Sequence, residues 1–214
     1  MLAQHLQPGR REAGCDEAGR GPLAGPVTAA AVLLPEGYRN EALDDSKKLT
    51  ERQREALRHV IEAEADAWAV ATVEPEDIDR LNILHAATHA MCLAANALLG
   101  NVEKGVVCGG KQLGTVIPEF LLVDGNKFYN ETPLQWQTIV GGDAKYMAIA
   151  AASILAKTYR DEAMIRLNAE YPGYGWDRNK GYPTAEHYDA IEHLGITPQH
   201  RRSFTLYRQH SLFE

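Results

Sequence analysis

Hydrophobic and polar positions follow two different periods along this chain of 214 residues, and each period predicts a different kind of element. Short apolar runs typical of β-strands end at Asp16 and cover residues 29–34, 66–73, 120–123 and 137–140. Helical spacing covers residues 51–65, 83–99, 144–160 and 185–194, with a short helix starting at Glu74-Pro75. Strands interspersed with helices of this length predict an α/β fold.

Local signals mark several element boundaries. Thr50 and Gln53 form a capping box at the start of one helix, and Thr184 is a good cap for the last helix. The alanine-rich helix over residues 144–160 is so small-sided that we expect it to lie tightly against the sheet. The glycine-rich residues 105–114 predict a flexible excursion or a small hairpin, and their Gly-Gly-Lys lacks the spacing of a Walker loop.

Composition narrows the class of protein without deciding its function. Hydrophobic residues make up 45% and charged residues 24% of the chain, as in ordinary globular proteins with one main domain. No apolar run reaches the roughly 18 residues of a membrane helix, and the first residues lack the apolar core of a secretory signal. Cys15, Cys92 and Cys108 show neither disulfide nor zinc spacing, so we expect buried free thiols and a cytoplasmic protein.

The net charge of −7 is unevenly distributed, which changes its meaning. Residues 59–104 hold eight acids against two basic residues. In contrast, residues 47–58 hold five basic residues against two acids, and residues 199–210 hold three arginines and two histidines with no acid. Two positive patches on an acidic body fit an enzyme with one side facing a polyanion, and each patch alone also fits a solvated helix face.

Acidic residues end several of the predicted apolar segments. Asp16 and Glu17 follow the first strand and open a stretch rich in glycine and proline up to Val27, while Asp124 ends a buried strand and Asp143 precedes the alanine-rich helix. Strand ends of an α/β sheet gather where ligands bind. Four acids crowded there require a counter-ion, so we expect a site for Mg²⁺ or Mn²⁺ that serves phosphate chemistry.

Each acid also has a local explanation. An Asp-Glu pair followed by glycine is common in turns, Asp124-Gly125 is a favoured hairpin turn, and Asp143 is a good helix N-cap. Turn chemistry does not explain why all four acids terminate apolar segments, and this favours the shared site.

The order of short motifs resembles the bacterial ribonuclease HII family, the type 2 ribonucleases H. The matching motifs span nearly the whole chain: Asp16-Glu17-Ala18-Gly19-Arg20-Gly21-Pro22, Asp45-Ser46-Lys47-Lys48-Leu49, Val123-Asp124-Gly125-Asn126, Gly142-Asp143-Ala144-Lys145-Tyr146, Ala151-Ala152-Ser153-Ile154-Leu155-Ala156-Lys157, Lys180-Gly181-Tyr182-Pro183-Thr184 and His200-Arg201-Arg202-Ser203-Phe204. Residues 105–114 depart from the pattern, since this excursion is longer than we expect for the family.

The resemblance implies a ribonuclease H-like fold, with a five-stranded mixed sheet flanked by helices. It divides the chain into a catalytic domain over residues 1–165 and a small helical region over residues 166–214 that grips substrate. It also implies a monomeric, cytoplasmic endonuclease that uses two Mn²⁺ or Mg²⁺ ions. The enzyme would cleave RNA in RNA–DNA hybrids and incise at single ribonucleotides in duplex DNA, leaving 3′-hydroxyl and 5′-phosphate ends.

Residue roles follow from the same resemblance. Asp16, Glu17, Asp124 and Asp143 match the catalytic, metal-binding acids. Gly19, Arg20 and Gly21 match the segment that reads the ribose 2′-hydroxyl, and Tyr182 matches a tyrosine that packs on the sugar at the RNA-to-DNA junction. We further expect Lys47, Lys48, Arg201 and Arg202 to hold phosphates. Arg20 could contact phosphate or balance the acids, and both roles stay open.

Two other classes of function fit parts of the sequence. A non-catalytic hybrid-binding protein would use the same basic patches, but the four intact acids disfavour it. A phosphatase or nucleotide hydrolase could use the glycine-rich loop on small phosphates, but the basic patches far from that loop disfavour this alternative.

Overall fold

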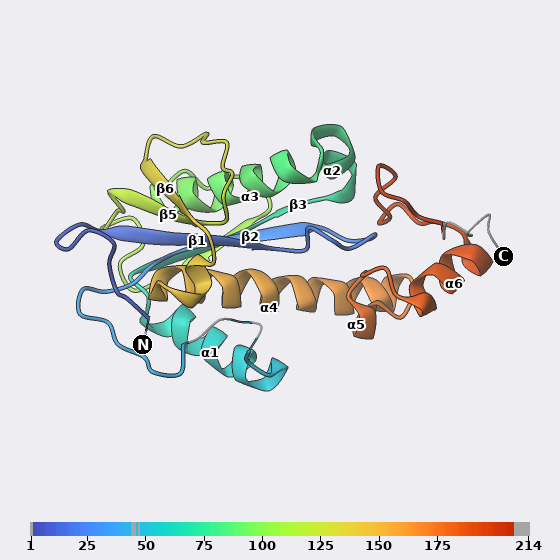
Figure 1. Ribbon diagram of the computed structural model, residues 1–214, viewed down its shortest axis with the longest axis horizontal. Helices are drawn as coiled ribbons and strands as arrows, with labels where there is room; N and C mark the ends of the chain where they lie inside the picture. The colour runs from blue at the N-terminus through green and yellow to red at the C-terminus, as the bar shows by residue number, and fades with distance from the viewer. Residues whose placement is uncertain (1, 44–45, 47, 208–214) are drawn as a thin grey trace.

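The computed structural model describes residues 2–43, 46 and 48–207. A central sheet separates two helical layers, with α3 on one face and α1 and α4 on the other (Figure 1). Helix α5 lies beside the C-terminal end of α4, and α6 lies beyond that end. Within the described residues, no helix is both long enough and apolar enough to cross a membrane.

The sheet is mixed and has the strand order β4-β3-β2-β1-β5-β6. Its strands are β1 (Glu12–Ala18), β2 (Val27–Leu33), β3 (Ala67–Val73), β4 (Val106–Gly109), β5 (Phe120–Asp124) and β6 (Gln135–Ile139). The pairs β1–β2, β2–β3 and β3–β4 are antiparallel, whereas β1–β5 and β5–β6 are parallel. The predicted α/β class with flanking helices is confirmed.

The sheet has six strands where five were expected. The additional strand is β4, which lies in the segment predicted to be a flexible excursion or hairpin. Val106 and Val107 pair with Ala71 and Val70 of β3, so the segment extends the sheet at its edge. The sequence signal is weak because the strand has only four residues, and the last of them is a glycine.

Alternation along the strands builds one core on each face. In β2, Ala29, Ala31 and Leu33 pack in the cluster under α3, whereas Ala30 and Val32 pack in the cluster under α1 and α4. Such alternation is the geometric consequence of a strand buried on both faces. The cysteines are free, with Cys15 and Cys92 buried and Cys108 only partly buried, which corrects the expectation for the last of them.

The helices are α1 (Glu51–Glu64), α2 (Pro75–Leu81), α3 (Ile83–Leu98), α4 (Met147–Glu170), α5 (Trp176–Asn179) and α6 (Ala185–Leu194), with a 3₁₀ turn η1 (Gly142–Ala144). The predicted capping box is present, since Thr50 accepts a hydrogen bond from the Gln53 amide and the Gln53 side chain accepts one from the Thr50 amide. Thr184 caps α6 through the amide of His187.

Helix α4 lies tightly against β1, as its small side chains predict. A Cβ atom at Gly14 would lie only 2.1 Å from the carbonyl carbon of Ala148, so the strand and the helix touch backbone to backbone at this point. The helix begins at Met147, three residues later than predicted, because residues 142–144 form the 3₁₀ turn. The contact between Gly14 and Ala148 fixes the position of α4 beside β1.

The C-terminal helices pack on the loop that follows β1. Leu23 and Ala24 of that loop share a small apolar cluster with Met164 of α4, Trp176 of α5 and Ile191 of α6. Helix α4 itself runs without interruption across residue 165, where the sequence analysis divides the chain. The division at that residue stays a prediction.

Candidate active site

The parallel pairing of β1 and β5 brings two of the predicted acids together. Cys15 lies opposite Val123 in this pairing, so Asp16 and Asp124 follow at neighbouring positions on the same edge of the sheet. Asp16 is only 5% exposed, and Glu17 is the next residue of the same strand. Three of the four predicted carboxylates therefore lie at the same end of the sheet.

Asp143 reaches this region through the 3₁₀ turn. The amide of Gly142 donates a 2.6 Å hydrogen bond to Oδ1 of Asp124, which fixes η1 beside the end of β5. A side chain at residue 142 would collide with Ile149, because an added Cβ would lie 2.5 Å from its Cδ1 atom. Asp143 is 3% exposed and does not line the cleft described below.

Burial and mutual repulsion shift the acids of β1. Burial raises the pKa of Asp16 well above its usual value, and the charges of Glu17 and Asp124 raise it further, against hydrogen bonds from Ser153 and the Glu17 amide. The pKa of Glu17 is also raised, chiefly by burial, although Arg20 forms a 3.2 Å ion pair with it. The site therefore holds carboxylates at an energetic cost.

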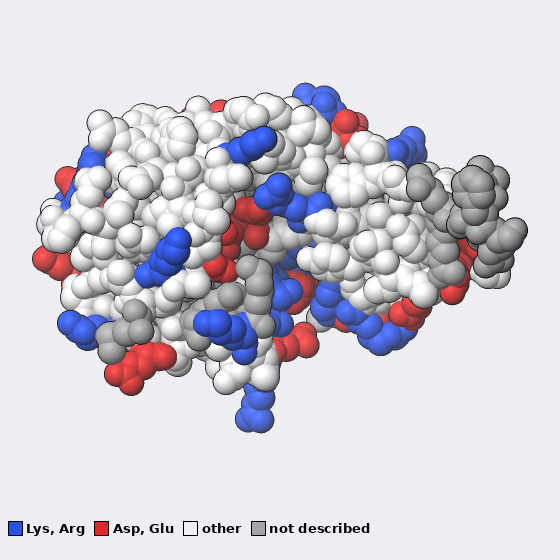
Figure 2. Space-filling view, in the orientation of Figure 1, with Lys and Arg blue, Asp and Glu red and all other residues white. Residues whose placement is uncertain are grey.

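The acids face a cleft of about 360 Å³ between the sheet and the loop that follows β1. Acidic side chains gather in a central hollow of the molecular surface, and basic side chains surround it (Figure 2). The cleft is lined by residues from five parts of the chain: Asp16, Glu17, Ala18, Gly19, Arg20, Gly21, Ser46, Asp124, Ser153, Lys157 and Tyr182. A smaller hollow of about 260 Å³ lies on the other side of Glu17 and Asp124, towards α3.

Tyr182 completes the cleft opposite the acids. Its ring is 42% exposed, and a Cβ atom at Gly21 would lie 3.5 Å from it. The amide of Leu23 donates a 2.8 Å hydrogen bond to the Gly181 carbonyl, which joins the loop after β1 to the segment that carries Tyr182. The sugar-reading loop and the tyrosine predicted from the sequence thus lie side by side.

Comparisons with known proteins agree with this geometry. The family model described as "Ribonuclease HII" matches residues 13–207. Ribonuclease HII of Bacteroides thetaiotaomicron is 53% identical over 206 residues, covering 96% of this chain and 95% of that protein. The protein of the same name from Parabacteroides distasonis is 54% identical, covering 96% of both chains.

The chain belongs to the ribonuclease HII family. Members of this family are metal-dependent endonucleases, ribonucleases H that act on RNA–DNA hybrids. Solved structures show the same fold: the archaeal ribonuclease HII from Archaeoglobus fulgidus, in its complex with PCNA, has a TM-score of 0.71 at 24% identity and covers 94% of this chain and 98% of its own. Ribonuclease H2 of Pyrococcus horikoshii has a TM-score of 0.67 at 25% identity, covering 92% of this chain and 94% of its own.

The donor set of this ribonuclease HII suits a hard divalent cation. Asp16, Glu17, Asp124 and Asp143 offer only carboxylate oxygens, the ligands that Mg²⁺ and Mn²⁺ prefer. Among the residues that the structure describes, no three His, Cys, Asp or Glu side chains converge closely enough to form a ready-made ion cage. A bound cation would offset the mutual repulsion of the acids that raises the pKa of Asp16.

Two serines and a lysine on the cleft wall were not predicted as site residues. Ser153 of α4 bonds to Asp16, and its Oγ lies 2.9 Å from Oγ of Ser46. Lys157, one turn later on α4, pairs with Asp161 at 3.3 Å. All three residues lie in motifs that match the family, and Ser153 and Lys157 are four residues apart on one helix, but neither signal points to the acids without a known position for α4.

The predicted phosphate contact of Arg201 is wrong. Its side chain is 0% exposed, because the guanidinium donates hydrogen bonds to backbone carbonyls of the loop after β1. Arg202 is exposed, and its amide donates to Asp79. Lys48 is exposed as well, whereas Lys47 and Asp45 lie outside the described residues.

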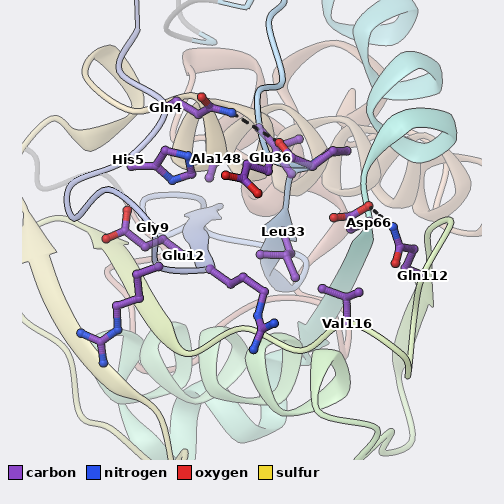
Figure 3. A pocket seen from close by; sticks show the side chains of 14 residues that line it. Gln4, His5, Gly9, Glu12, Leu33, Glu36, Asp66, Gln112, Val116 and Ala148 are labelled. Atoms are coloured by element: carbon purple, nitrogen blue, oxygen red, sulfur yellow. Dashed lines mark hydrogen bonds between the residues drawn. The ribbon is translucent and has the colours of Figure 1, made fainter.

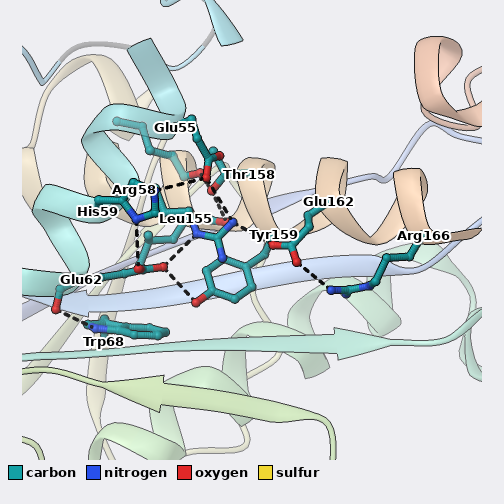
Figure 4. Close-up of polar contacts among 11 residues, drawn as sticks. Glu55, Arg58, His59, Glu62, Trp68, Leu155, Thr158, Tyr159, Glu162 and Arg166 are labelled. Atoms are coloured by element: carbon teal, nitrogen blue, oxygen red, sulfur yellow. Dashed lines mark hydrogen bonds and ion pairs between the residues drawn. The ribbon is translucent and has the colours of Figure 1, made fainter. Parts of the chain in front are cut away.

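The basic patch at residues 47–58 is weaker than its sequence suggests. Arg58 pairs with Glu62 at 2.8 Å and Glu162 at 2.9 Å while lying over the ring of Tyr159 (Figure 4). Arg54 donates to the carbonyls of Ser46 and Leu49. These two arginines join α1 to its surroundings, whereas Lys48 and Arg52 of the same patch are exposed.

A cavity of about 330 Å³ lies at the opposite end of the sheet (Figure 3). It also contains buried acids, Glu12 and Asp66. Both are satisfied: Glu12 accepts hydrogen bonds from the amides of Leu6 and Gln7, and Asp66 accepts one from the Gln112 side chain. The two buried acids of this cavity therefore have hydrogen-bond donors as partners, whereas Asp16 and Glu17 of the active-site cleft also face the charge of Asp124.

Proposed function

We propose that this ribonuclease HII incises duplex DNA at single ribonucleotides as well as cleaving longer RNA stretches in RNA–DNA hybrids. The products would carry 3′-hydroxyl and 5′-phosphate ends. The observation that supports this proposal most strongly is the shared cleft. The acids of β1 and β5, the glycine loop and Tyr182 all face the same space, so one nucleotide can meet all three at once.

The acids are proposed to hold two divalent cations, Mg²⁺ or Mn²⁺, with Asp16, Glu17, Asp124 and Asp143 as ligands. Bound cations of this kind supply an activated water and neutralise charge that develops at the cleaved phosphate. The chain's own part is to hold the carboxylates in place: the Gly142 amide orients Asp124, and Ser153 orients Asp16.

Ribose recognition is assigned to residues 19–21. The 2′-hydroxyl is the one group that separates RNA from DNA at a given nucleotide, and it is small. Backbone amides in a glycine loop can approach it closely because no side chain intervenes. Tyr182 offers a flat ring at the neighbouring position, where a sugar without a 2′-oxygen packs best.

Phosphate contacts are assigned to Arg20, Lys48 and Arg202, with Lys47 as a further expectation. Arg20 can serve both of its possible roles, because it pairs with Glu17 and still exposes 52% of its side chain. Contacts of this kind add affinity and salt sensitivity without sequence preference.

Residues 166–214 are proposed to grip the duplex beyond the cleft. The position of these residues supports this assignment. Helices α5 and α6 extend the molecule past the end of the sheet (Figure 1), and Tyr182 lies in the segment between them. We expect the enzyme to act as a cytoplasmic monomer. Family membership sets aside the alternatives of a non-catalytic binder and a small-phosphate hydrolase.

A cleavage map on duplex DNA with one ribonucleotide tests the proposal. With Mg²⁺ or Mn²⁺ the wild type should cut at a single phosphate next to the ribonucleotide, and with chelator it should not cut. An enzyme that cleaves long hybrids but leaves this duplex intact would contradict the proposal.

Tyr182 variants test the junction assignment on the same two substrates. Tyr182→Ala should lower kcat/KM for the single ribonucleotide by on the order of tenfold more than for long hybrids, because a stacked ring contributes about 1–3 kcal/mol. Tyr182→Phe is the matched control, since it keeps the ring and should stay near wild type. Equal losses on both substrates for the alanine variant would count against the junction role.

A further inference from the structure

Two buried arginines stand behind the loop that follows β1. Arg160 of α4 is 2% exposed and Arg201 is 0% exposed. Within the described residues neither guanidinium forms an ion pair, and all their hydrogen bonds go to backbone carbonyls. Arg201 donates to Gly19 at 2.7 Å, Gly25 at 3.0 Å, Pro26 at 3.1 Å and Arg20 at 3.2 Å, and Arg160 donates to Pro26 at 3.0 Å, Lys180 at 3.0 Å and Ala24 at 3.3 Å.

Keeping these charges buried is unfavourable. A cation taken out of water without a carboxylate partner loses hydration that carbonyl dipoles restore only in part. The pKa of Arg201 is lowered to about 9, chiefly by burial and also by the nearby charge of Arg160. Burial likewise lowers the pKa of Arg160 to about 10. Neutral side chains could fill the same space but would not offer the fixed set of donors of a guanidinium. The two arginines therefore have a role beyond packing.

The bonds of Arg201 determine which way the loop amides point. All peptide bonds of the described chain are trans, and in a trans peptide the carbonyl of one residue points opposite to the N–H of the next. Because the Gly19 and Arg20 carbonyls face the buried Arg201, the N–H groups of Arg20 and Gly21 point away from it. Residues 19–21 line the cleft and Arg201 does not, so these donors face the cleft.

The bonds of Arg160 join the loop to the tyrosine segment. The same guanidinium binds Ala24 and Pro26 on one side and Lys180 on the other, and it lies 5.9 Å from the centre of the Tyr182 ring. Gly19 leaves the space that this arginine occupies, since an added Cβ would lie 2.0 Å from its Nε atom. The loop and the tyrosine are therefore held by one shared side chain.

We propose that Arg160 and Arg201 are positioning residues that fix the amides of residues 19–21 and the ring of Tyr182 in one rigid frame, so that ribose reading and junction reading act together. The proposal rests on the proposed function of these two elements. Neither arginine lines the cleft that the acids face.

Lysine substitutions test the frame, because an ammonium group keeps the charge but cannot span carbonyls on separate segments. Arg160→Lys and Arg201→Lys should each lower kcat/KM on the single-ribonucleotide duplex by tenfold or more, and up to about 100-fold, as expected when reacting groups are misplaced by about 1 Å. Mn²⁺ affinity should stay at the wild-type value. Arg11→Lys, at an exposed arginine that pairs with Glu119 and has no assigned part in binding, is the control and should not change activity.

Combination with Tyr182→Ala separates positioning from a general structural role. If one frame holds both elements, the double variant Arg160→Lys/Tyr182→Ala should lose less than the product of the two single losses. Assays run below each variant's melting transition remove the effect of lower stability. Wild-type kcat/KM in the folded lysine variants, or fully multiplicative losses, would overturn the proposal.

If the lysine variants do not fold, NMR relaxation of backbone amides in the wild-type enzyme tests the proposal instead. The amides of Arg20 and Gly21 should show order parameters near the rigid-backbone value of about 0.85 without substrate, whereas values below about 0.6 would overturn the proposal. Failure of the proposed function looks different, since the wild type itself would then leave the single-ribonucleotide duplex uncut.

Discussion

At one end of β1 the side chain of Glu12 is 5% exposed, and at the other end Asp16 is equally buried at 5%. Glu12 accepts hydrogen bonds of 2.7 Å and 2.9 Å from two backbone amides of the N-terminal segment. Asp16 accepts a 2.7 Å hydrogen bond from the Glu17 amide and another from Ser153, but it also faces the charges of Glu17 and Asp124, which together with burial raise its pKa. The two acids belong to the same strand and differ in their partners.

The comparison shows how to tell a structural acid from a catalytic one when both are buried. A carboxylate with amide donors stabilises the fold, because its charge is balanced where it lies. A carboxylate that faces other carboxylates destabilises the free protein and becomes favourable only with a cation. Burial alone therefore does not identify an active site, whereas the charges around a buried group do.

Asp16→Asn should give the largest effect. Loss of a metal ligand should reduce cleavage of an RNA–DNA hybrid by about 10³-fold or more, which corresponds to several kcal/mol of transition-state stabilisation. The melting temperature should be no lower than that of the wild type, because a repelled charge is removed. Hybrid cleavage and thermal unfolding, measured on the same preparation, check both expectations. A stable variant with normal turnover would show that Asp16 does not differ from Glu12 in function.

Glu12→Gln should show the reverse pattern. Two amides lose a charged acceptor, so the free energy of unfolding should fall by about 1–3 kcal/mol while kcat/KM stays at the wild-type value. Chemical denaturation and a hybrid-cleavage assay test this prediction. Glu36→Gln, an exposed residue of the same cavity, is the control and should change neither quantity.

Acid should destabilise the C-terminal helices through their buried histidines. Burial lowers the pKa of His187 from its ordinary value, and burial and the charge of His187 lower the pKa of His200 from 6.5 to about 4. The unfolded state therefore binds protons first, so this contribution to stability is complete above pH 6.5 and is lost as pH falls towards 4, by about 1 kcal/mol per unit for one histidine.

Thermal unfolding between pH 7 and pH 5 checks this effect. The raised pKa of Asp16 acts in the opposite direction, since the folded state then binds the additional proton, and an Asp16→Asn background removes that contribution. His200→Gln should flatten the pH dependence, whereas the exposed His59→Gln should leave it unchanged. If the pH dependence of thermal stability is unchanged in His200→Gln, the buried histidine is not its cause.

Exposed cations should give the smallest effect. Arg202→Gln should weaken hybrid binding about threefold or less and lower the slope of log K against log salt by about 1, if it contacts one phosphate. Binding titrations at several salt concentrations measure this slope. Arg11→Gln, whose partner Glu119 lies near the far end of β1, is the control, and an equal change in both variants would argue against a specific contact.

Local patterns in the sequence were enough to find Asp16, Glu17 and Asp124, because strand ends are short-range signals and a parallel pairing brings them to one edge. Asp143 was predicted to lie just before the alanine-rich helix, and it does, although it belongs to the 3₁₀ turn η1 rather than to the cap of α4. Strand β4 was not predicted as a strand, since four residues between glycines carry little periodicity.

The errors on the basic residues have a different cause. Arg201 reads as a surface cation next to Arg202, but its partners lie about 180 positions earlier in the chain. The hydroxyl pair of Ser46 and Ser153 is likewise separated by 107 positions. Such groups are identified only once the fold brings the segments together, and no local composition indicates whether a cation faces solvent or backbone.

Calorimetric titration with Mn²⁺ tests most directly the claim that separate acids form one cation site. We expect the wild type and Glu12→Gln to bind Mn²⁺ equally, whereas Asp16→Asn and Asp124→Asn should each bind it at least about tenfold more weakly because one charged ligand is lost. Unchanged Mn²⁺ affinity in Asp124→Asn would contradict the account, because the carboxylates of β1 and β5 would then not share an ion.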